Sequence, residues 1–397
     1  MDHTMTKIKS YRIQSIDLLR GVVMVIMALD HVRDYFHEGA IVSDPTNMET
    51  TTPLLFFTRF ITHYCAPVFI FLAGTSAFLY GRNKTKNHLF KFLFTRGLWL
   101  VILEVTLMTF LWWFDLNFNF FNLQVIWAIG LCMMFLAILV YLPRKWIIAL
   151  GLLLVFGHNL LDGITMEGLG VSSILWYILH QAAFIQVGET WISFLYPILP
   201  WVGLMCLGYA FGSLYKNDVS AALRKKWLLG LGLGSIVLFL VLRGINIYGD
   251  LVPWSVQKNT TYTLLSFFNV TKYPPSLLFL LVTMGPSFLF LYASENLRNK
   301  VTDFFLVYGR VPLFYYVVHV LVIHLAAIAG LLLTGGDWKV MILDQNSFTD
   351  GSLAGYGYSL GVVYLVWIGV VFLLYPISHW YMKYKANNRD KWWLSYL

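Results

Sequence analysis

Apolar residues run along almost the whole chain in segments of about twenty, separated by short polar stretches. This length and hydrophobicity are typical of helices that cross a bilayer. We predict ten such helices, over residues 15–36, 53–80, 89–113, 123–141, 145–161, 194–215, 226–243, 275–293, 307–333 and 358–382. The predicted fold class is an all-α, polytopic membrane protein, with residues 1–397 forming a single transmembrane domain.

Composition strengthens this prediction and fixes an orientation. The chain is 58% hydrophobic and only 12% charged, whereas soluble proteins carry about 25% charged residues. Lys and Arg concentrate in alternate loops, over residues 7–12, 82–91, 144–145, 216–226, 298–310 and 383–391. The positive-inside rule places these loops and both termini in the cytoplasm, with the protein in the cytoplasmic (inner) membrane. The net charge of +8 then reflects topology, and no nucleic-acid partner is expected.

Other motifs exclude several classes of protein. The three cysteines, Cys65, Cys132 and Cys206, lie in apolar segments without a disulfide or zinc pattern, and we expect no metal. A Walker or GxGxxG motif is absent from the sequence, which argues against an ATPase or a dinucleotide enzyme. The aromatic stretch 159–192 contains no Lys or Arg and is expected to lie in the membrane interface or to form a lid. A small-residue motif at Gly208 and Gly212 permits a homodimer.

The first predicted helix carries unusually many charges for a membrane segment. They are Asp17, Arg20, Asp30, His31, Arg33 and Asp34. Each charge near the bilayer centre costs roughly 2.5–3.5 kcal/mol on insertion scales, so such residues usually mark a substrate path, a proton relay or a catalytic site. The alternative is a set of buried ion pairs that only fixes how the helix packs.

The spacing of these residues predicts one functional stripe. Asp17, Arg20, Met24, Met27, His31 and Asp34 follow one another at intervals of three or four, so they share a helix face. Arg20 and His31 lie roughly 16 Å apart along the axis. His31 with Asp34 one turn later is a candidate acid–base pair. Asp30 points about 100° away and is expected to meet a substrate or another helix.

Further polar residues extend both ends of this predicted site. Arg59 and His63 share a face of the second helix, at the same depth as His31, although a snorkelling Arg and a packed core His would look the same. Near the cytoplasmic side lie Arg96 and the basic loop with Lys84 and Lys86. These cations would suit a phosphorylated donor, but the positive-inside rule alone also explains them.

Four segments of the N-terminal third resemble a known family. They read RIQSIDLLRGVVMVIMALDHVRDYF, TRFITHYCAPVFIFLAGTSAF, LFTRGLWLVILE and LQVIWAIGLCM, and together cover about residues 12–134. They resemble a bacterial family of membrane proteins related to the catalytic domain of heparan-alpha-glucosaminide N-acetyltransferase. Arg20 and His31 also reproduce an Arg-x10-His spacing found in membrane acyltransferases that modify bacterial surface polysaccharides.

The resemblance implies a reaction and a set of roles. Acetyl-CoA, or another acyl-CoA, would bind from the cytoplasm and pass its acyl group to a sugar amine or hydroxyl on the outer side of the membrane. His31 would be the general base or the acylated residue, oriented by Asp34 or Asp30. Arg59 or Arg33 would stabilise the oxyanion.

On the donor side, Arg20, Asp17, Arg96, Lys84 and Lys86 would serve the CoA or the helix that holds it. The family's catalytic His follows its asparagine by a longer interval than Asp30 to His31, which makes His37 a rival to His31. A second hypothesis is a proton-coupled transporter or flippase, in which the same buried charges drive export of a polar or glycan substrate. A third is a non-catalytic membrane scaffold. A transporter would move its substrate without consuming acyl-CoA.

Overall fold

A computed structural model describes residues 13–40, 44–348, 351, 353, 355–388 and 390–395. The predicted cytoplasmic cations Lys7, Lys9, Arg12 and Arg389 lie outside the described residues. The N-terminal half contains α1 (Gln14–Phe36), α2 (Pro53–Thr62), α3 (Cys65–Gly81), α4 (Lys86–Leu103), a π-helical turn η1 (Glu104–Met108), α5 (Thr109–Trp113), β1 (Phe120–Leu123), α6 (Val125–Leu139), α7 (Arg144–Gly157), η2 (His158–Leu161), α8 (Val171–Leu179), β2 (Ala183–Val187) and β3 (Thr190–Phe194).

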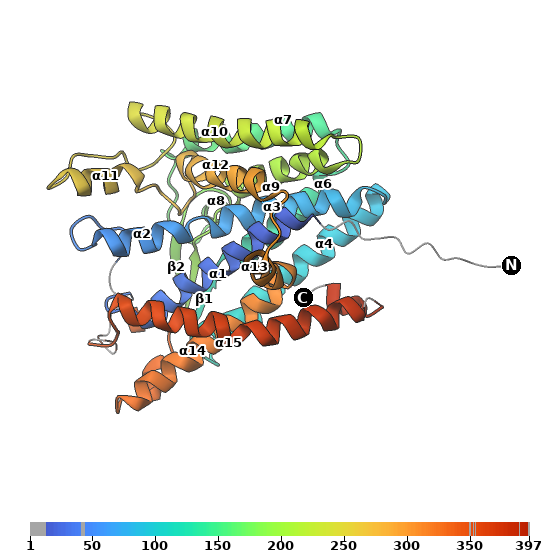
Figure 1. The fold of residues 1–397 in the computed structure, drawn as a ribbon. Helices are drawn as coiled ribbons and strands as arrows, with labels where there is room; N and C mark the ends of the chain where they lie inside the picture. Colours follow the sequence, from blue (N-terminus) through green and yellow to red (C-terminus); the bar gives the residue numbers. More distant parts are fainter. Residues whose placement is uncertain are drawn as a thin grey trace.

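The C-terminal half continues with α9 (Ile198–Phe211), η3 (Gly212–Tyr215), α10 (Ala221–Ile245), α11 (Thr260–Phe268), α12 (Leu277–Ser294), α13 (Lys300–Arg310), α14 (Pro312–Leu333), η4 (Trp338–Met341), η5 (Asn346–Phe348), α15 (Leu360–Asn387) and η6 (Trp392–Ser395). Most of the long helices run side by side in one bundle (Figure 1).

Each of the ten predicted segments contains a helix. Within the described residues, eight helical segments are long and apolar enough to cross a membrane: 53–81, 86–113, 144–161, 198–215, 221–245, 277–294, 312–333 and 360–387. The remaining two are α6, which is shorter, and α1, whose charges set it apart. The protein is therefore a helical, multi-pass membrane protein.

The charged helix α1 lies at the centre of this bundle. It packs against α2, α3, α12, α13, α14 and α15, and most of its residues are buried. Its contact with α13 is backbone to backbone, because a Cβ atom on Gly309 would lie 1.8 Å from the carbonyl oxygen of Asp17 and one on Gly21 would lie 2.0 Å from that of Phe305. Only glycine permits this approach.

Two predicted helices are interrupted in the structure. The segment 53–80 breaks at His63 and Tyr64, between α2 and α3. Pro67 explains the break, because a proline ring clashes with the carbonyl four residues earlier and cannot donate to it. The segment 307–333 divides at Val311, where Pro312 begins α14, since a residue before proline avoids the helical region.

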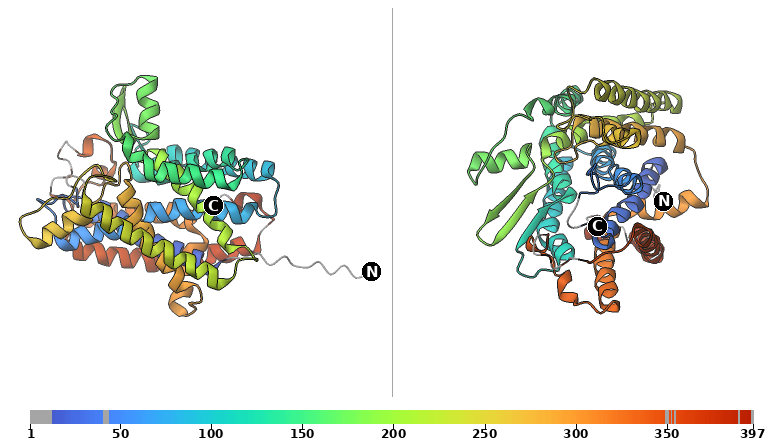
Figure 2. Two further views of the ribbon diagram at one scale, coloured as in Figure 1. Left: turned by 90° about the horizontal axis from the view of Figure 1, so that it is seen from above. Right: turned by 90° about the vertical axis from the view of Figure 1, so that its left-hand side faces the viewer.

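A small sheet departs from the all-α prediction. Strand β3 pairs in parallel with β1, Phe120 opposite Trp191, and antiparallel with β2, Ile185 opposite Ile192. These short aromatic and β-branched runs favour strands, and Gly188 forms the turn between β2 and β3 with φ +63°. The stretch 159–192, expected to be interfacial or a lid, thus contains α8 and a hairpin, which project from the bundle (Figure 2).

The small-residue motif of Gly208 and Gly212 makes contacts within the chain. A Cβ atom on Gly208 would lie 2.1 Å from the Phe71 carbonyl oxygen, and Gly212 faces Phe78. This small-residue motif therefore packs against α3 of the same chain and does not support a dimer contact. The homodimer stays a prediction.

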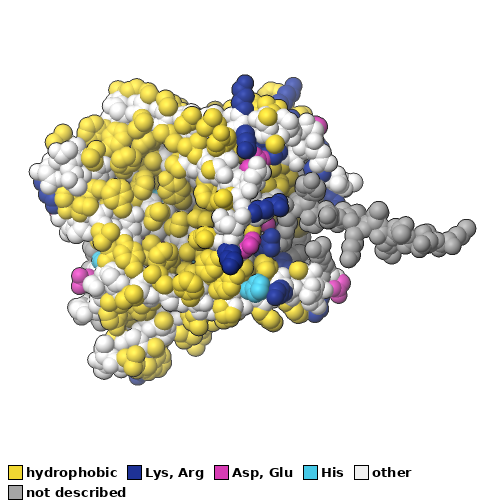
Figure 3. All heavy atoms as spheres, viewed as in Figure 1, with side chains coloured by type: hydrophobic (Ala, Val, Ile, Leu, Met, Phe, Trp, Pro, Cys, Tyr) yellow, Lys and Arg dark blue, Asp and Glu magenta, His cyan; other side chains and the backbone are white. Residues whose placement is uncertain are grey.

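Lys and Arg gather at one end of the helices, which we call the basic end. There α4 begins at Lys86, α7 at Arg144 and α13 at Lys300, and α15 ends shortly after Lys385. Figure 3 shows a broad apolar band on the face in view, with most Lys and Arg side chains toward one end of it.

Candidate active site

Two cavities lie next to each other along α1. The histidine cavity, about 470 Å³, is lined by His31, Asp30, Asp34, Arg59 and Lys272 among others. The arginine cavity, about 510 Å³, is lined by Arg20, Arg96, Arg310 and Lys385 among others and lies toward the basic end. Met27, Phe69 and Val125 line both cavities, so these three side chains form the partition between them.

The predicted stripe of α1 faces both cavities. Arg20, Met24 and Met27 line the arginine cavity, and Met27, His31 and Asp34 line the histidine cavity. A single helix face, read at intervals of three and four residues, therefore connects the two sites.

His31 forms a hydrogen-bonded pair with a second buried histidine. Its Nδ1 lies 2.7 Å from Nε2 of His319 on α14, and the two rings are stacked. Nδ1 of His319 lies 2.8 Å from the backbone carbonyl oxygen of Tyr315. Trp112 packs edge-on against His31 with ring centroids 4.7 Å apart. The imidazole is thus held from two sides.

This chain of contacts fixes the tautomers of both rings when they are neutral. A carbonyl oxygen can only accept, so Nδ1 of His319 carries the proton and its Nε2 accepts. Nδ1 of His31 must then donate to His319, which leaves the lone pair on Nε2 of His31. Nε2 is therefore the nitrogen of neutral His31 that is able to accept a proton.

The carboxylates near His31 have partners other than the histidine. Asp30 accepts from Arg33 Nη2 at 3.0 Å and forms an ion pair with Arg59 Nη1 of α2. Asp34 accepts from Arg33 Nη2 at 2.6 Å. The expectation that Asp34 or Asp30 orients His31 therefore differs from the structure, in which His319 occupies that position. This contact could not be predicted from the sequence, because 288 positions separate the two histidines.

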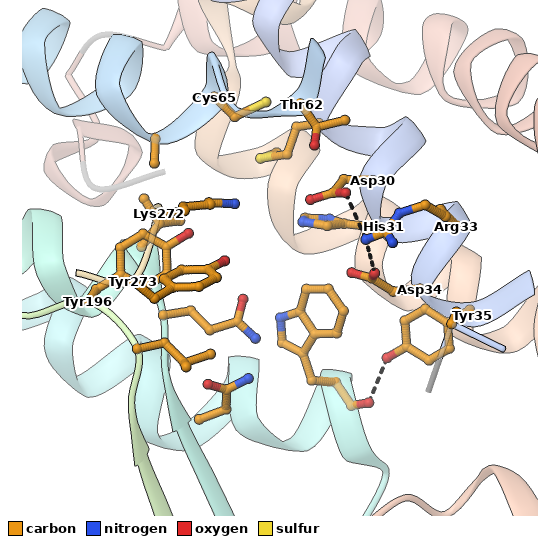
Figure 4. Close-up of a pocket in the computed structure, with 18 of the residues that line it drawn as sticks. Asp30, His31, Arg33, Asp34, Tyr35, Thr62, Cys65, Tyr196, Lys272 and Tyr273 are labelled. Atoms are coloured by element: carbon orange, nitrogen blue, oxygen red, sulfur yellow. Dashed lines mark hydrogen bonds and ion pairs between the residues drawn. The ribbon is translucent and has the colours of Figure 1, made fainter. Parts of the chain in front are cut away.

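The opposite wall of the histidine cavity comes from loops and the small sheet. Lys272 and Tyr273 precede α12, Tyr196 precedes α9, and Figure 4 shows the Lys272 side chain pointing toward the helix with Asp30 and His31. Amide and hydroxyl side chains complete this wall, namely Asn122, Gln124, Gln345 and Ser347. Oε1 of Gln345 is buried and has no hydrogen-bond partner among the described residues.

The arginine cavity differs in charge. Arg20 donates to Asp17 Oδ1, to the Gly309 carbonyl oxygen and to Ser76 Oγ, each at 3.2 Å. These bonds tie α1 to α13 and α3. In the part of the chain that the structure describes, no Asp or Glu lines this cavity beside its four cationic side chains.

Five predicted site residues lie outside the cavities. Asp17 pairs with Arg20 within α1, at 3.2 Å. His37 follows α1 and pairs with Tyr358, and His63 packs against Phe279 at the end of α2. Lys86 donates to the Tyr141 carbonyl oxygen at 2.6 Å, and Lys84 is exposed. None of these five is among the residues that line either cavity.

Sequence reasoning missed His319, Lys272, Arg310 and Lys385 as site residues. His319 lies in the predicted segment 307–333 without a polar neighbour in sequence that points to a site, and the two lysines lie outside the predicted helices. One signal was present for Arg310, because the proline two residues later predicts the helix end that turns it toward the arginine cavity.

A π-helical turn lies close to the partition. Glu104, which begins η1, is buried and accepts from the backbone N–H of Gln124 at 3.4 Å, and Gln124 and Val125 line the histidine cavity. This contact joins the π-helical turn to the backbone at the start of α6. Irregular turns of this type are frequent at functional sites.

The helical bundle, the buried histidine pair and the adjoining cationic cavity define a multi-pass membrane protein with a candidate acid–base centre inside its membrane domain. The family model described as heparan-alpha-glucosaminide N-acetyltransferase, catalytic, matches residues 12–248. This match covers more than half of the chain, so the chain belongs to that family, which implies an acetyltransferase. A search of curated proteins finds no match. His319 and Lys272 lie beyond the matched residues.

Proposed function

We propose that this protein transfers an acetyl group from acetyl-CoA, bound in the arginine cavity, to a sugar amine or hydroxyl bound in the histidine cavity. The observation that carries this proposal is the partition of Met27, Phe69 and Val125, which alone belongs to both cavities. An acyl group that passes these side chains moves from a cationic site to a histidine without leaving the protein.

The orientation follows from the basic end. With α1 and α6 counted as spans, the chain crosses the membrane ten times, and both termini face the cytoplasm. The arginine cavity then opens toward the cytoplasm, where acyl-CoA is made, and the histidine cavity toward the outer side of the inner membrane. The supporting observation is the distribution of Lys and Arg at the helix ends.

The donor is recognised by charge. CoA carries phosphate groups, and Arg96, Arg310 and Lys385 line a cavity without a carboxylate among its described lining residues. Arg20, braced by Asp17, holds the wall of the same cavity. Lys84 and Lys86 lie at the basic end outside the cavity and would contribute to attraction over distance.

Nε2 of His31 takes the proton of the acceptor amine or hydroxyl as that group attacks the thioester carbonyl carbon. The new C–N or C–O bond forms, the C–S bond breaks, and the proton passes to the CoA thiolate. His319 holds the base in the required tautomer. Arg59 and Arg33, fixed by Asp30 and Asp34, provide positive charge beside the developing oxyanion.

The experiment that tests this proposal measures acetyl-CoA binding and slow acetyl-CoA hydrolysis by the purified protein. The wild type is compared with His31→Ala and with His37→Ala as a matched control. We expect all three to bind acetyl-CoA, and His31→Ala alone to lose hydrolysis.

Two other results would decide against the proposal. Absence of acetyl-CoA binding by folded wild-type protein would reject the donor and favour the transporter hypothesis, as would substrate movement without acyl-CoA consumption. Loss of hydrolysis in His37→Ala with retention in His31→Ala would transfer the catalytic role to His37.

A further inference from the structure

Lys272 is a cation without a counterion in the histidine cavity. The two guanidinium groups of this cavity, Arg33 and Arg59, are each bound to a carboxylate. Lys272 forms no ion pair within 4 Å with any residue that the structure describes, and its ammonium group lies 5.0 Å from the Tyr273 ring centroid. An ammonium group lacking an anion in a partly dehydrated cavity is a ready site for one.

The backbone around Lys272 is braced. Asp250 accepts from the Thr271 N–H at 2.9 Å, from the Thr271 hydroxyl at 2.7 Å and from the Ser276 hydroxyl at 2.6 Å. The Ser276 N–H closes the turn by donating to the Thr271 carbonyl oxygen at 3.0 Å. Lys272 is therefore presented from a fixed turn, which lowers the ordering cost of binding.

Tyr273 reports a positive field at this end of the cavity. Burial raises the pKa of its phenol, but the charges of Lys272 and Arg59, together with hydrogen bonds from Lys272 and Tyr196, bring the pKa below its ordinary value. The same field would act on a ligand placed beside these residues.

The remaining wall suits a sugar ring. Tyr196 and Phe184 offer aromatic surface, and Gln345 offers a buried oxygen that has no hydrogen-bond partner within the described parts of the chain. Such an oxygen requires a donor, which a sugar hydroxyl or ammonium group supplies.

We propose that the acceptor is an anionic sugar, whose phosphate or carboxylate group binds Lys272 while its hydroxyl or amine groups contact Gln345. This inference rests on the proposed function, because only an acyltransferase has an acceptor. The predicted binding of the sugar can nevertheless be measured without acetyl-CoA. Lys272 is then the residue that selects charged acceptors over neutral ones.

The test is calorimetric binding of three sugars to the full-length protein in detergent without CoA. The sugars are glucosamine, glucosamine 6-phosphate and 2-amino-2-deoxyglucuronic acid, with inorganic phosphate as a separate probe. We expect at least one anionic sugar to bind about 10-fold or more tightly than glucosamine, as one charge-assisted hydrogen bond provides. Lys272→Gln should remove the difference, and Lys272→Arg should retain most of it.

Lys258→Gln is the matched control, because Lys258 belongs to the same connection between α10 and α12, on the other side of α11, lies over the Tyr262 ring and is not among the residues that line the cavity. Equal affinity of the wild type for neutral and anionic sugars, or failure to bind either anionic sugar, overturns the proposal. So does inorganic phosphate binding as tightly as the anionic sugars, or a Lys272→Gln effect on CoA binding alone. Failure of the proposed function would instead appear as absent acetyl-CoA binding with sugar binding intact.

Discussion

The histidine cavity and the arginine cavity share one helix, yet their charges are organised in opposite ways. In the histidine cavity, Asp30 and Asp34 hold Arg33 and Arg59 in a closed network. In the arginine cavity, four cations line the wall, and no carboxylate stands among the described lining residues. A paired network fixes geometry, whereas an excess of one sign attracts a ligand of the other sign. The first arrangement suits chemistry, and the second suits the binding of a polyanion.

The largest expected effect comes from breaking the network of the histidine cavity. Asp30→Asn leaves Arg59 without its carboxylate and leaves Arg33, whose side chain is 4% exposed, with Asp34 as its one ion-pair partner among the described residues. Loss of one member of a buried pair costs about 3–5 kcal/mol. Thermal unfolding in detergent, followed by tryptophan fluorescence, should show the corresponding fall in stability.

Asp17→Asn is the control for that variant, because it removes the same type of pair from the other end of α1. Arg20 keeps its hydrogen bonds to Gly309 and Ser76, so we expect a loss of about 1 kcal/mol. Equal losses in the two variants would contradict the contrast drawn between the cavities.

The second effect concerns catalysis in the histidine cavity only. His319→Phe removes the acceptor for Nδ1 of His31, and we expect acetyl transfer or acetyl-CoA hydrolysis to fall about 10²-fold with the affinity for acetyl-CoA unchanged. His319→Gln should recover part of the rate, since its side-chain oxygen can accept the same hydrogen bond. If both variants lose activity equally while folded, orientation by hydrogen bonding is not the role of His319.

The third effect concerns the arginine cavity only. Arg310→Gln should raise the Kd for acetyl-CoA about 10-fold, as expected for a lost charge-assisted contact, and should weaken its salt dependence. Titration calorimetry at two salt concentrations measures both. Lys84→Gln is the control, because Lys84 is exposed outside the cavity. A larger effect at Lys84 than at Arg310 would restore the basic loop as the donor site.

The smallest effect tests how α2 presents Arg59. The Thr52 hydroxyl caps α2 by accepting from the Leu55 N–H at 3.2 Å. Thr52→Ala should cost about 1 kcal/mol of stability and leave acetyl-CoA affinity unchanged. A change in that affinity would show that the two cavities are coupled through α2.

The parts of the site that could be predicted from the sequence are mainly the residues that lie on one face of a single helix. The stripe from Arg20 to Asp34 follows from helical periodicity, and Arg59 follows from its depth in the next segment. His319 could not be paired with His31, because 288 residues separate them and only tertiary packing brings them together. Lys272 could not be distinguished from Lys258, because a loop has no periodicity that reports which side chain turns inward.

The fold shows the same division. Hydrophobic segments predicted the helices, and prolines could have predicted the breaks near Pro67 and at Pro312. All three strands were missed because each has only four or five residues, too few to show alternation, and β1 in addition pairs with the distant β3. His63 and Arg59 were predicted on one face of a continuous helix, whereas α2 ends at Thr62 and only Arg59 of the two lines the histidine cavity.

The ion pairs of α1 also bear on how the chain is made. Asp17 with Arg20, and Asp30 and Asp34 with Arg33, are pairs within a single helix, and Arg59 on the next helix pairs with Asp30. The charges of these ion pairs thus balance within the first hairpin to leave the ribosome. This hairpin can enter the lipid as a unit long before Gly309 and His319 are synthesised. The helices that are made later then cover its polar face.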